Sequence, residues 1–387
     1  MKTDFEHIKA YDDINVNSAI KEILNDKDFI NRINQNPDIL KIFKIDGVQN
    51  FIDKFLNIHT VKDFQKIMFK LLDTNIELTT DGLSFSMDEN LNDKNKILFI
   101  SNHRSTSLDS AYLNYILRFL NLETVYSGAG DNIFETKWLG HLIRLNKGFI
   151  IKRNVEDIDD KIAQAKLLSG YINYLLEQNK TVWITQKPGR SKDGIDKTDS
   201  VIITMLNKYN ENLKYSDWLK KITLLPICVS WEIIPCADFM VKETIGNSIQ
   251  EPFVDRNNIL HEIGSFKGRV HYHFGKRIFG EKRKEIVNNI DEQILSNYIL
   301  WDTNLYAFLE NENLSKKDKN LITANIDINR AKSIFEKTKL TTNKEKRLLL
   351  DMYANPVREA LKLSSSLENV ILKSNKLKEN ANSVILH

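Results

Sequence analysis

From Ile97 onward, short apolar runs alternate with longer amphipathic segments, and this alternation constrains the fold more than any other feature of the sequence. The apolar runs have the length of buried strands, whereas the segments between them place apolar residues at helical spacing. A strand followed by a helix and then another strand is typical of parallel sheets. We therefore expect an α/β fold with a mixed, mostly parallel sheet flanked by helices. The expected strands are ILFIS, TVYSGAG, FIIK, TVWITQ, ITLLPICVSW and RVHYHFG.

Helical patterns dominate both ends of the 387-residue chain. The segment VKDFQKIMFKLL carries apolar residues on one helical face, and IELTTDGLSFS, which follows it, predicts a strand or hairpin around Gly82. The tail is rich in Ser, Asn and Lys, which predicts a weak helix or a partly disordered end. We divide the chain into a helical N-terminal region (1–75), an α/β domain (76–280), a C-terminal helical region (281–363) and a polar tail (364–387).

Composition narrows the class of protein. The formal net charge of +3 gives no indication of a nucleic-acid partner. Cys228 and Cys236 cannot form a disulfide framework and lack the spacing of a zinc site, so we expect two core residues in a reducing cytosol. The N-terminus lacks a signal-peptide profile, and no uncharged run reaches the roughly 18 residues that span a bilayer. Any membrane contact is therefore expected to be peripheral.

The strand ILFIS ends in the polar loop NHRSTSLD. In an open α/β sheet, ligands lie beyond the carboxyl ends of the strands, so this loop is a candidate site. A hydroxyl residue after Arg104 can cap the next helix, which places Asp109 in its first turn. From there the carboxylate can bond one imidazole nitrogen of His103 and make the other a better base. The sequence predicts a His103–Asp109 dyad; the alternative is a capping aspartate beside an ordinary loop histidine.

Basic residues follow two further strands. Arg153 comes after FIIK, and the loop KPGRSKDG after TVWITQ contains Arg190 and Lys192. Guanidinium groups and exposed backbone amides bind phosphate oxygens, so these loops suit a phosphate if they meet at one edge of the sheet. Taken singly, each is explained as a solvated turn. Together with a base, they predict an enzyme that acts on a phosphorylated alcohol.

Several motifs occur in the order and at spacings comparable to those of one enzyme family. They are FISNHRSTSLDSAYLNYIL, LIRLNKGFIIKR, WITQKPGRSKDGIDKTDSVIITML, LLPICVSWEIIPC and KGRVHYHFG. With them, the chain from about Leu83 to Gly275 resembles the glycerol-3-phosphate and 1-acylglycerol-3-phosphate (lysophosphatidate) acyltransferase family, in a bacterial branch. Ordered motifs are more specific than any one of them. The resemblance implies the glycerolipid acyltransferase fold and an O-acyltransferase of phospholipid biosynthesis.

The resemblance also implies a role for each matching residue. His103 matches the general base that takes the proton from the acceptor hydroxyl, and Asp109 matches the acid that orients it. Arg153 matches the phosphate-binding arginine of the second motif, and Pro226 the proline of the fourth. The expected substrate-binding residues are Asn102, Arg104, Arg153, Gly189, Arg190, Ser191 and Lys192.

Two departures from the family pattern concern the site. Pro188 stands directly before Gly189, where the third motif of many members has a glutamate. A proline removes both that carboxylate and a backbone donor, so the acceptor is held differently or turnover is weakened. The interval between His103 and Asp109 is also longer than is usual, with Ser105 at the nearer position.

No cofactor or metal is expected, because the thioester donor is already activated and the sequence offers no convincing ligand set. His271 and His273 would point the same way from a strand, as a metal pair or as structural or surface residues. The expected co-substrates are acyl-CoA or acyl carrier protein and a phosphorylated glycerol. A lipid product would suit a cytoplasmic protein bound peripherally to the inner face of the cell membrane. The segment FETKWLGHLIRL suits either such an interface or core packing.

Two other functions are compatible with the sequence. One is a catalytically weakened lipid- or phosphate-binding protein on the same fold, with Pro188 marking decay of the site. The other is an interaction scaffold that uses the helical ends. Within the enzyme interpretation, the acceptor stays open among glycerol-3-phosphate, lysophosphatidate and another hydroxylated lipid.

Overall fold

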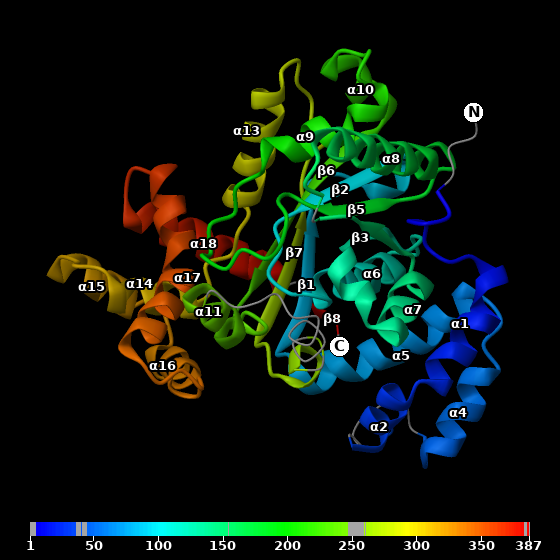
Figure 1. The fold of residues 1–387 in the computed structure, drawn as a ribbon. Coiled ribbons are helices and arrows are strands. Elements are labelled where there is room, and N and C mark those ends of the chain that lie inside the picture. Colours follow the sequence, from blue (N-terminus) through cyan, green and yellow to red (C-terminus); the bar gives the residue numbers. More distant parts are fainter. Residues whose placement is uncertain are drawn as a thin grey trace.

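The computed structural model describes residues 5–35, 40, 45–153, 155–246, 259, 261–382 and 385–386. Within them, an eight-stranded sheet forms the centre, and helices cover both of its faces (Figure 1). Helices of the two chain ends pack on opposite sides of this centre (Figure 1). The expected α/β class, with a mostly parallel sheet and helical additions, is confirmed.

The strands follow the order β4-β3-β5-β2-β6-β7-β1-β8 across the sheet. Strands β2 to β6 run parallel to one another, whereas β7 and β1 run the other way and β8 is antiparallel to β1. The strands are β1 (Gly82–Met87), β2 (Ile97–Ser101), β3 (Tyr126–Gly130), β4 (Gly148–Ile151), β5 (Val182–Thr185), β6 (Thr223–Trp231), β7 (Arg269–Phe274) and β8 (Ile385–Leu386).

Strand β2 lies in the middle of the sheet, between β5 and β6. All five of its residues are buried, as expected of a strand covered on both faces. Ser101, its last residue, is level with Thr185 at the end of β5. Because β2 to β6 are parallel, their carboxyl ends meet at one edge of the sheet, which we call the carboxyl edge.

Helices connect the strands and cover the two faces. Helices α6 and α7 lie on one side of β2 and β5, and α8 and α9 lie on the other (Figure 1). The helices within and directly after the sheet region are α6 (Leu108–Phe119), α7 (Lys137–Leu145), α8 (Ile158–Glu177), α9 (Ser200–Leu206), α10 (Tyr215–Lys221), α11 (Ala237–Ile245) and α13 (Arg283–Ser296).

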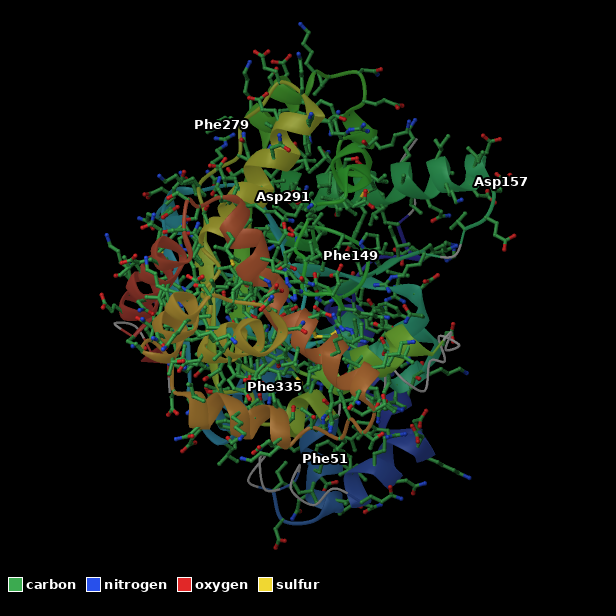
Figure 2. All side chains as sticks on the ribbon, turned by 90° about the vertical axis from the view of Figure 1, so that its left-hand side faces the viewer. Phe51, Phe149, Asp157, Phe279, Asp291 and Phe335 are labelled. Carbon is green, nitrogen blue, oxygen red and sulfur yellow. The ribbon has the colours of Figure 1, made fainter. Side chains whose placement is uncertain are left out.

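The N-terminal helices form a hydrophobic core of their own together with α7. They are α1 (Asp13–Asn25), α2 (Lys27–Gln35), α4 (Val48–Leu56) and α5 (Val61–Thr79). Phe51, labelled in Figure 2, belongs to this core, as do Trp138 and Leu139 of α7, each 6% exposed. The apolar stripe of FETKWLGHLIRL is therefore used largely for core packing.

Helix α5 is longer than the sequence pattern indicated. Ile76 and Thr79 were expected in a strand or hairpin, but they form the last turn of α5, and β1 begins at Gly82. Phe64, Phe69 and Ile76 form one apolar helical face that is buried in the core. This burial outweighs the alternation of apolar and polar residues after Asn75, which had favoured a strand.

The C-terminal part of the chain is mainly helical and ends in strand β8. It contains α14 (Asp302–Asn311), α15 (Lys316–Thr323), α16 (Ile328–Glu336), α17 (Asn343–Lys362) and α18 (Leu367–Ala381). Phe335 of α16, labelled in Figure 2, packs against the main core, and so do Leu367 and Val370 of α18. The polar tail thus contains a packed helix, while the proposed domain boundaries stay predictions.

Candidate active site

The loop between β2 and α6 brings His103 and Asp109 together at the carboxyl edge. The Nδ1–H group of His103 donates a hydrogen bond to Asp109 Oδ2 at 2.9 Å. The Asp109 side chain is 1% exposed and that of His103 is 12% exposed, so the imidazole reaches solvent while the carboxylate does not. Because Nδ1 holds the proton, Nε2 carries the lone pair and is the basic nitrogen.

Four donors hold the Asp109 carboxylate in place. Besides His103, the backbone amides of Arg104 and Ser105 donate to Oδ2 at 2.8 and 3.0 Å. The indole N–H of Trp231, at the end of β6, donates to Oδ1 at 2.9 Å. The six-residue interval therefore lets one carboxylate close the β2–α6 loop and orient the imidazole at the same time. Trp231 was missed by the sequence analysis, because it lies on a strand far along the chain.

A second carboxylate, that of Glu262, satisfies the next amides of the same loop. Glu262 accepts from the backbone N–H of Thr106 at 2.7 Å and of Ser107 at 3.1 Å. Burial raises the pKa of Glu262, and these donors together with nearby Arg190 oppose the rise. No local pattern predicts this contact, because its two partners are 156 residues apart in the chain. The amides of 104 to 107 thus all bind carboxylates of the protein itself.

Asn102 and Arg104, expected to bind substrate, are fully buried and used within the protein. Asn102 exchanges two hydrogen bonds with the backbone of Val229 in β6, and its amide also donates to Asp196 at 3.0 Å. Arg104 donates to Asp196 at 2.6 Å and to the carbonyl of Gly194 at 3.0 Å. Burial alone would lower the pKa of Arg104, but the charge and hydrogen bond of Asp196, together with Tyr298 and Asp193, outweigh it and raise the pKa.

These contacts fix the loop after β5 against the loop after β2. We call residues 187–197 the third loop. Ser191 is buried, its amide donates to the carbonyl of His103 at 2.8 Å, and its hydroxyl donates to Asp196 at 2.6 Å. Gly189 has a φ of +76°, a conformation that favours glycine, with open space where a Cβ would stand. The third loop therefore lies directly beside the His103–Asp109 pair.

The two cations expected at the tip of the third loop are paired with a carboxylate. Glu243 of α11 binds Arg190 Nη2 at 3.1 Å and Lys192 Nζ at 2.9 Å. The Arg190 side chain is 8% exposed, and its Nη1 atom has no hydrogen-bond partner among the described residues. Glu243 therefore satisfies only part of the Arg190 guanidinium.

Residues 83–207 match the model of the acyltransferase family. No curated protein matches the chain. The acyltransferase match covers β1 to β5 and every expected site residue, from Asn102 to Lys192. It supports a general acyltransferase and therefore a transferase. Trp231, Glu243 and Glu262, which support the site, lie outside the matched acyltransferase segment.

Arg153 lies at the same edge of the sheet but farther from the base. It follows β4, which is separated from β2 by β3 and β5. With strands about 4.8 Å apart, three steps amount to roughly 14 Å. The guanidinium of Arg153 lies against Gly130, where an added Cβ atom would collide with it. The backbone amide of Arg153 donates a hydrogen bond to Asp131 at 3.3 Å. Arg153 is exposed and does not join the His103 cluster directly.

His271 and His273 form a hydrogen-bonded ladder with two serines of β1. The Ser84 hydroxyl donates to a backbone carbonyl and lies 2.9 Å from His271 Nδ1, and Ser86 lies 2.9 Å from both His271 Nε2 and His273 Nδ1. Burial, with a smaller effect of His273, lowers the pKa of His271 to about 3. Of the two alternatives for this pair, the structure favours the structural one.

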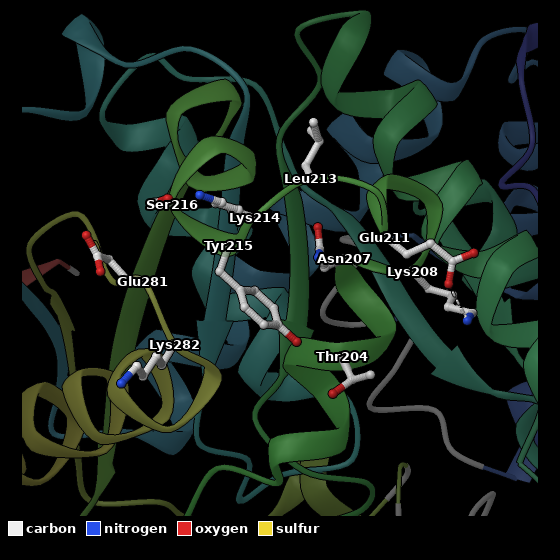
Figure 3. Close-up of a pocket in the computed structure, with 10 residues that line it drawn as sticks. All are labelled: Thr204, Asn207, Lys208, Glu211, Leu213, Lys214, Tyr215, Ser216, Glu281 and Lys282. Atoms are coloured by element: carbon white, nitrogen blue, oxygen red, sulfur yellow. Dashed lines mark hydrogen bonds and ion pairs between the residues drawn. The ribbon is translucent and has the colours of Figure 1, made fainter.

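Metal-ligand groups, membrane-spanning helices and cavities are further features to consider among the described residues. No group of three or more His, Cys, Asp or Glu side chains there could hold a metal ion. Among the same residues, no helix combines the length and apolar character needed to span a membrane. A cavity of about 570 Å³ lies between α9, α10 and the start of α13, lined by Asn207, Tyr215 and several lysines (Figure 3). It is at the edge opposite to His103, since it adjoins the start of β6.

Proposed function

We propose that the protein transfers a fatty acyl group from a thioester donor to a hydroxyl group of glycerol-3-phosphate or lysophosphatidate. The observation that carries this proposal is the 2.9 Å hydrogen bond between His103 and Asp109 within the segment that matches acyltransferases. A neutral imidazole held by a buried carboxylate is suited to take a proton from an alcohol.

In the proposed reaction, His103 Nε2 removes the proton of the acceptor hydroxyl as its oxygen attacks the thioester carbonyl. The new C–O bond gives a tetrahedral intermediate, the C–S bond then breaks, and the proton passes from His103 to the thiolate. The products are an ester and a free thiol, so no oxidant or further co-reactant is needed. Asp109 stays ionised throughout and stabilises the imidazolium that forms.

The oxyanion of the intermediate needs donors that the protein has not already used. The amides of residues 104 to 107 bind Asp109 and Glu262, so they are poor candidates. Within the described chain, no hydrogen bond uses the amides of Gly189 and Arg190. We therefore favour the tip of the third loop as the source of oxyanion donors, each contributing roughly 3 kcal/mol if well placed.

Acceptor binding is proposed to use Arg190 and Lys192, with Arg153 at the outer end of the edge. Glu243 now neutralises the first two, so an acceptor phosphate has to share or displace that carboxylate. This competition is also the observation that favours the second candidate, a catalytically weakened lipid- or phosphate-binding protein. A peripheral position at a membrane and donation by acyl-CoA or acyl carrier protein belong to the same proposal.

The test is thiol release from palmitoyl-CoA and from an acyl carrier protein thioester, with glycerol-3-phosphate or lysophosphatidate as acceptor. We expect acceptor-dependent release by the wild type, its loss in His103→Ala, and retention in His59→Ala, which removes an exposed histidine between α4 and α5. Equal inactivity of the wild type and His103→Ala with every pair would favour the binding protein. Wild-type activity of a His103→Ala, Arg190→Ala double mutant would favour the scaffold.

A further inference from the structure

The third loop is supported from two sides. On the side of the His103–Asp109 pair, the amide of Ser191 donates to the carbonyl of His103 at 2.8 Å, and the side chain of Arg104 donates to the carbonyl of Gly194 at 3.0 Å. On its other side the loop contacts α17, which packs against α11 and α14 (Figure 1). The C-terminal helices thus reach the loop that carries the cations proposed to bind the acceptor.

Asn355 of α17 forms a direct hydrogen bond with the third loop. Its side-chain amide donates to the carbonyl of Asp193 at 2.6 Å. Arg358 donates to the oxygen of the same amide at 2.7 Å, and the carboxylates of Asp351 and Glu312 bind Arg358 in turn. Because the oxygen of Asn355 accepts from Arg358, its NH₂ group has to face the loop. Neighbouring side chains of α14 and α17 therefore fix Asn355 as a donor to the third loop.

A second contact with α17 lies at the next residue of the loop. Gly194 has a φ of +77°, and a Cβ added there would lie 2.0 Å from the carbonyl oxygen of Met352. Pro356 stands four residues after Met352 within the same helix and has no N–H to donate to that carbonyl. The proline thus removes the usual helical donor of the carbonyl against which the loop packs, and a glycine is required opposite to it.

The same turn of α17 is fixed to the rest of the protein. Tyr353, which is 2% exposed, accepts through its hydroxyl from the backbone amide of Ile234 at 2.7 Å, and its carbonyl accepts from Asn304 at 2.9 Å. Ile234 comes three residues after the end of β6, and Asn304 belongs to α14. One turn of α17 therefore connects the third loop to the end of β6 and to α14.

We propose that Asn355 is a positioning residue for the acceptor, because it holds the third loop that carries Arg190 and Lys192. Lys192 lies between the two supports of the loop, and Arg190 stands two residues before it. Loss of the Asn355 bond should let both cations move, while the His103–Asp109 pair keeps its own hydrogen bonds. The role in acceptor binding rests on the proposed function, whereas the hold on the loop can be measured without turnover.

Two substitutions of Asn355 separate its bond to the loop from its place within α17. Asn355→Ala removes the bonds to both Asp193 and Arg358, whereas Asn355→Asp keeps an oxygen for Arg358 and has no N–H for the loop. An effect that both variants share therefore comes from the loop bond. Asn343→Ala, at an exposed position of the same helix, is the matched control. Melting curves show which variants are folded.

The first measurement is hydrogen exchange of the third loop, which needs no substrate. The amides of Ser191 and Gly194 are hydrogen-bonded in the folded protein. We expect them to exchange about fivefold faster in both Asn355 variants, the ratio that the loss of one typical hydrogen bond gives, and at the wild-type rate in Asn343→Ala. Unchanged exchange in the folded Asn355 variants would overturn the proposal.

The second measurement is the thiol-release assay with glycerol-3-phosphate as acceptor. In both Asn355 variants the KM for the acceptor should rise by about fivefold. The pH midpoint of kcat should stay at the wild-type value, because the His103–Asp109 pair is unchanged. An unchanged KM together with faster exchange, or a shifted midpoint, would refute the positioning role. Inactivity of the wild type would refute the proposed function instead, and hydrogen exchange would still decide whether Asn355 holds the loop.

Discussion

Replacement of Asp109 by asparagine separates the structural role of this residue from its proposed catalytic role. The amide oxygen can take the place of Oδ2 and keep the bonds from His103, Arg104 and Ser105. Its NH₂ group then faces the indole N–H of Trp231, where Oδ1 now accepts a hydrogen bond. Two donors would oppose each other in a site where Trp231 is fully buried.

The stability effect of Asp109→Asn follows from this geometry. An unsatisfied buried donor costs about 1–3 kcal/mol, so we expect the free energy of unfolding in urea to fall by that amount. In a double-mutant cycle, Trp231→Phe removes the opposing donor, and the double mutant should be more stable than the sum of the single effects predicts, by about 1–3 kcal/mol. Additive effects would show that the indole bond does not stabilise the carboxylate.

The activity effect should be independent of this rescue. The asparagine keeps the His103 tautomer but has no negative charge to stabilise the imidazolium, so kcat should fall by roughly 10²–10⁴ in the thiol-release assay. Because Trp231→Phe restores no charge, the double mutant should stay as slow as Asp109→Asn alone. Recovery of kcat together with stability would refute the catalytic role and assign Asp109 to loop closure only.

Three further predictions concern charges around the sheet. Because the pKa of His271 is about 3 in the fold and about 6.5 in the unfolded chain, only the unfolded chain binds this proton between those values. Stability is therefore lost as pH falls below 6.5, by about 2 kcal/mol at pH 5, and urea unfolding of His271→Asn should show a correspondingly flatter pH dependence than the wild type. Glu243→Gln frees Arg190, so the KM for glycerol-3-phosphate should fall by up to about tenfold, and an unchanged KM would exclude this arginine from acceptor binding. Glu232→Gln removes a buried partner of Arg269 and should lower the free energy of unfolding by about 3–5 kcal/mol, measured in urea at pH 7.

The fold was predictable where a short stretch of sequence is enough to identify a strand or helix. Each strand expected from the apolar runs after Ile97 is present, because buried parallel strands leave a dense apolar signature in the sequence. The start of β1 was less predictable, since Ile76 fits a strand alternation and a helical face equally well, and only tertiary packing selects the helix.

The same distinction holds within the candidate site. His103 and Asp109 are six residues apart on one strand–loop–helix unit, so their contact could be inferred from capping and strand-end rules. Their support could not be inferred, because Trp231 and Glu262 come from distant segments. Arg104 was expected to face a substrate, and only the structure reveals that Asp196 binds it inside the protein.

The candidate site has two parts. One is the His103–Asp109 pair, whose hydrogen bonds form within the protein, and the other is the pair of cations Arg190 and Lys192, which a carboxylate already binds. In the first part, Asp109 accepts four hydrogen bonds that need no ligand, so the orientation of His103 is set before any substrate arrives. In the second part, the charges of Arg190 and Lys192 are shared with Glu243, so an anion gains only the difference between its own attraction and that of the carboxylate. Since a phosphate carries more charge than a carboxylate, it can still displace Glu243 from these cations. We therefore expect the KM for the acceptor to depend on the charge of the acceptor, and kcat to depend on His103 and Asp109.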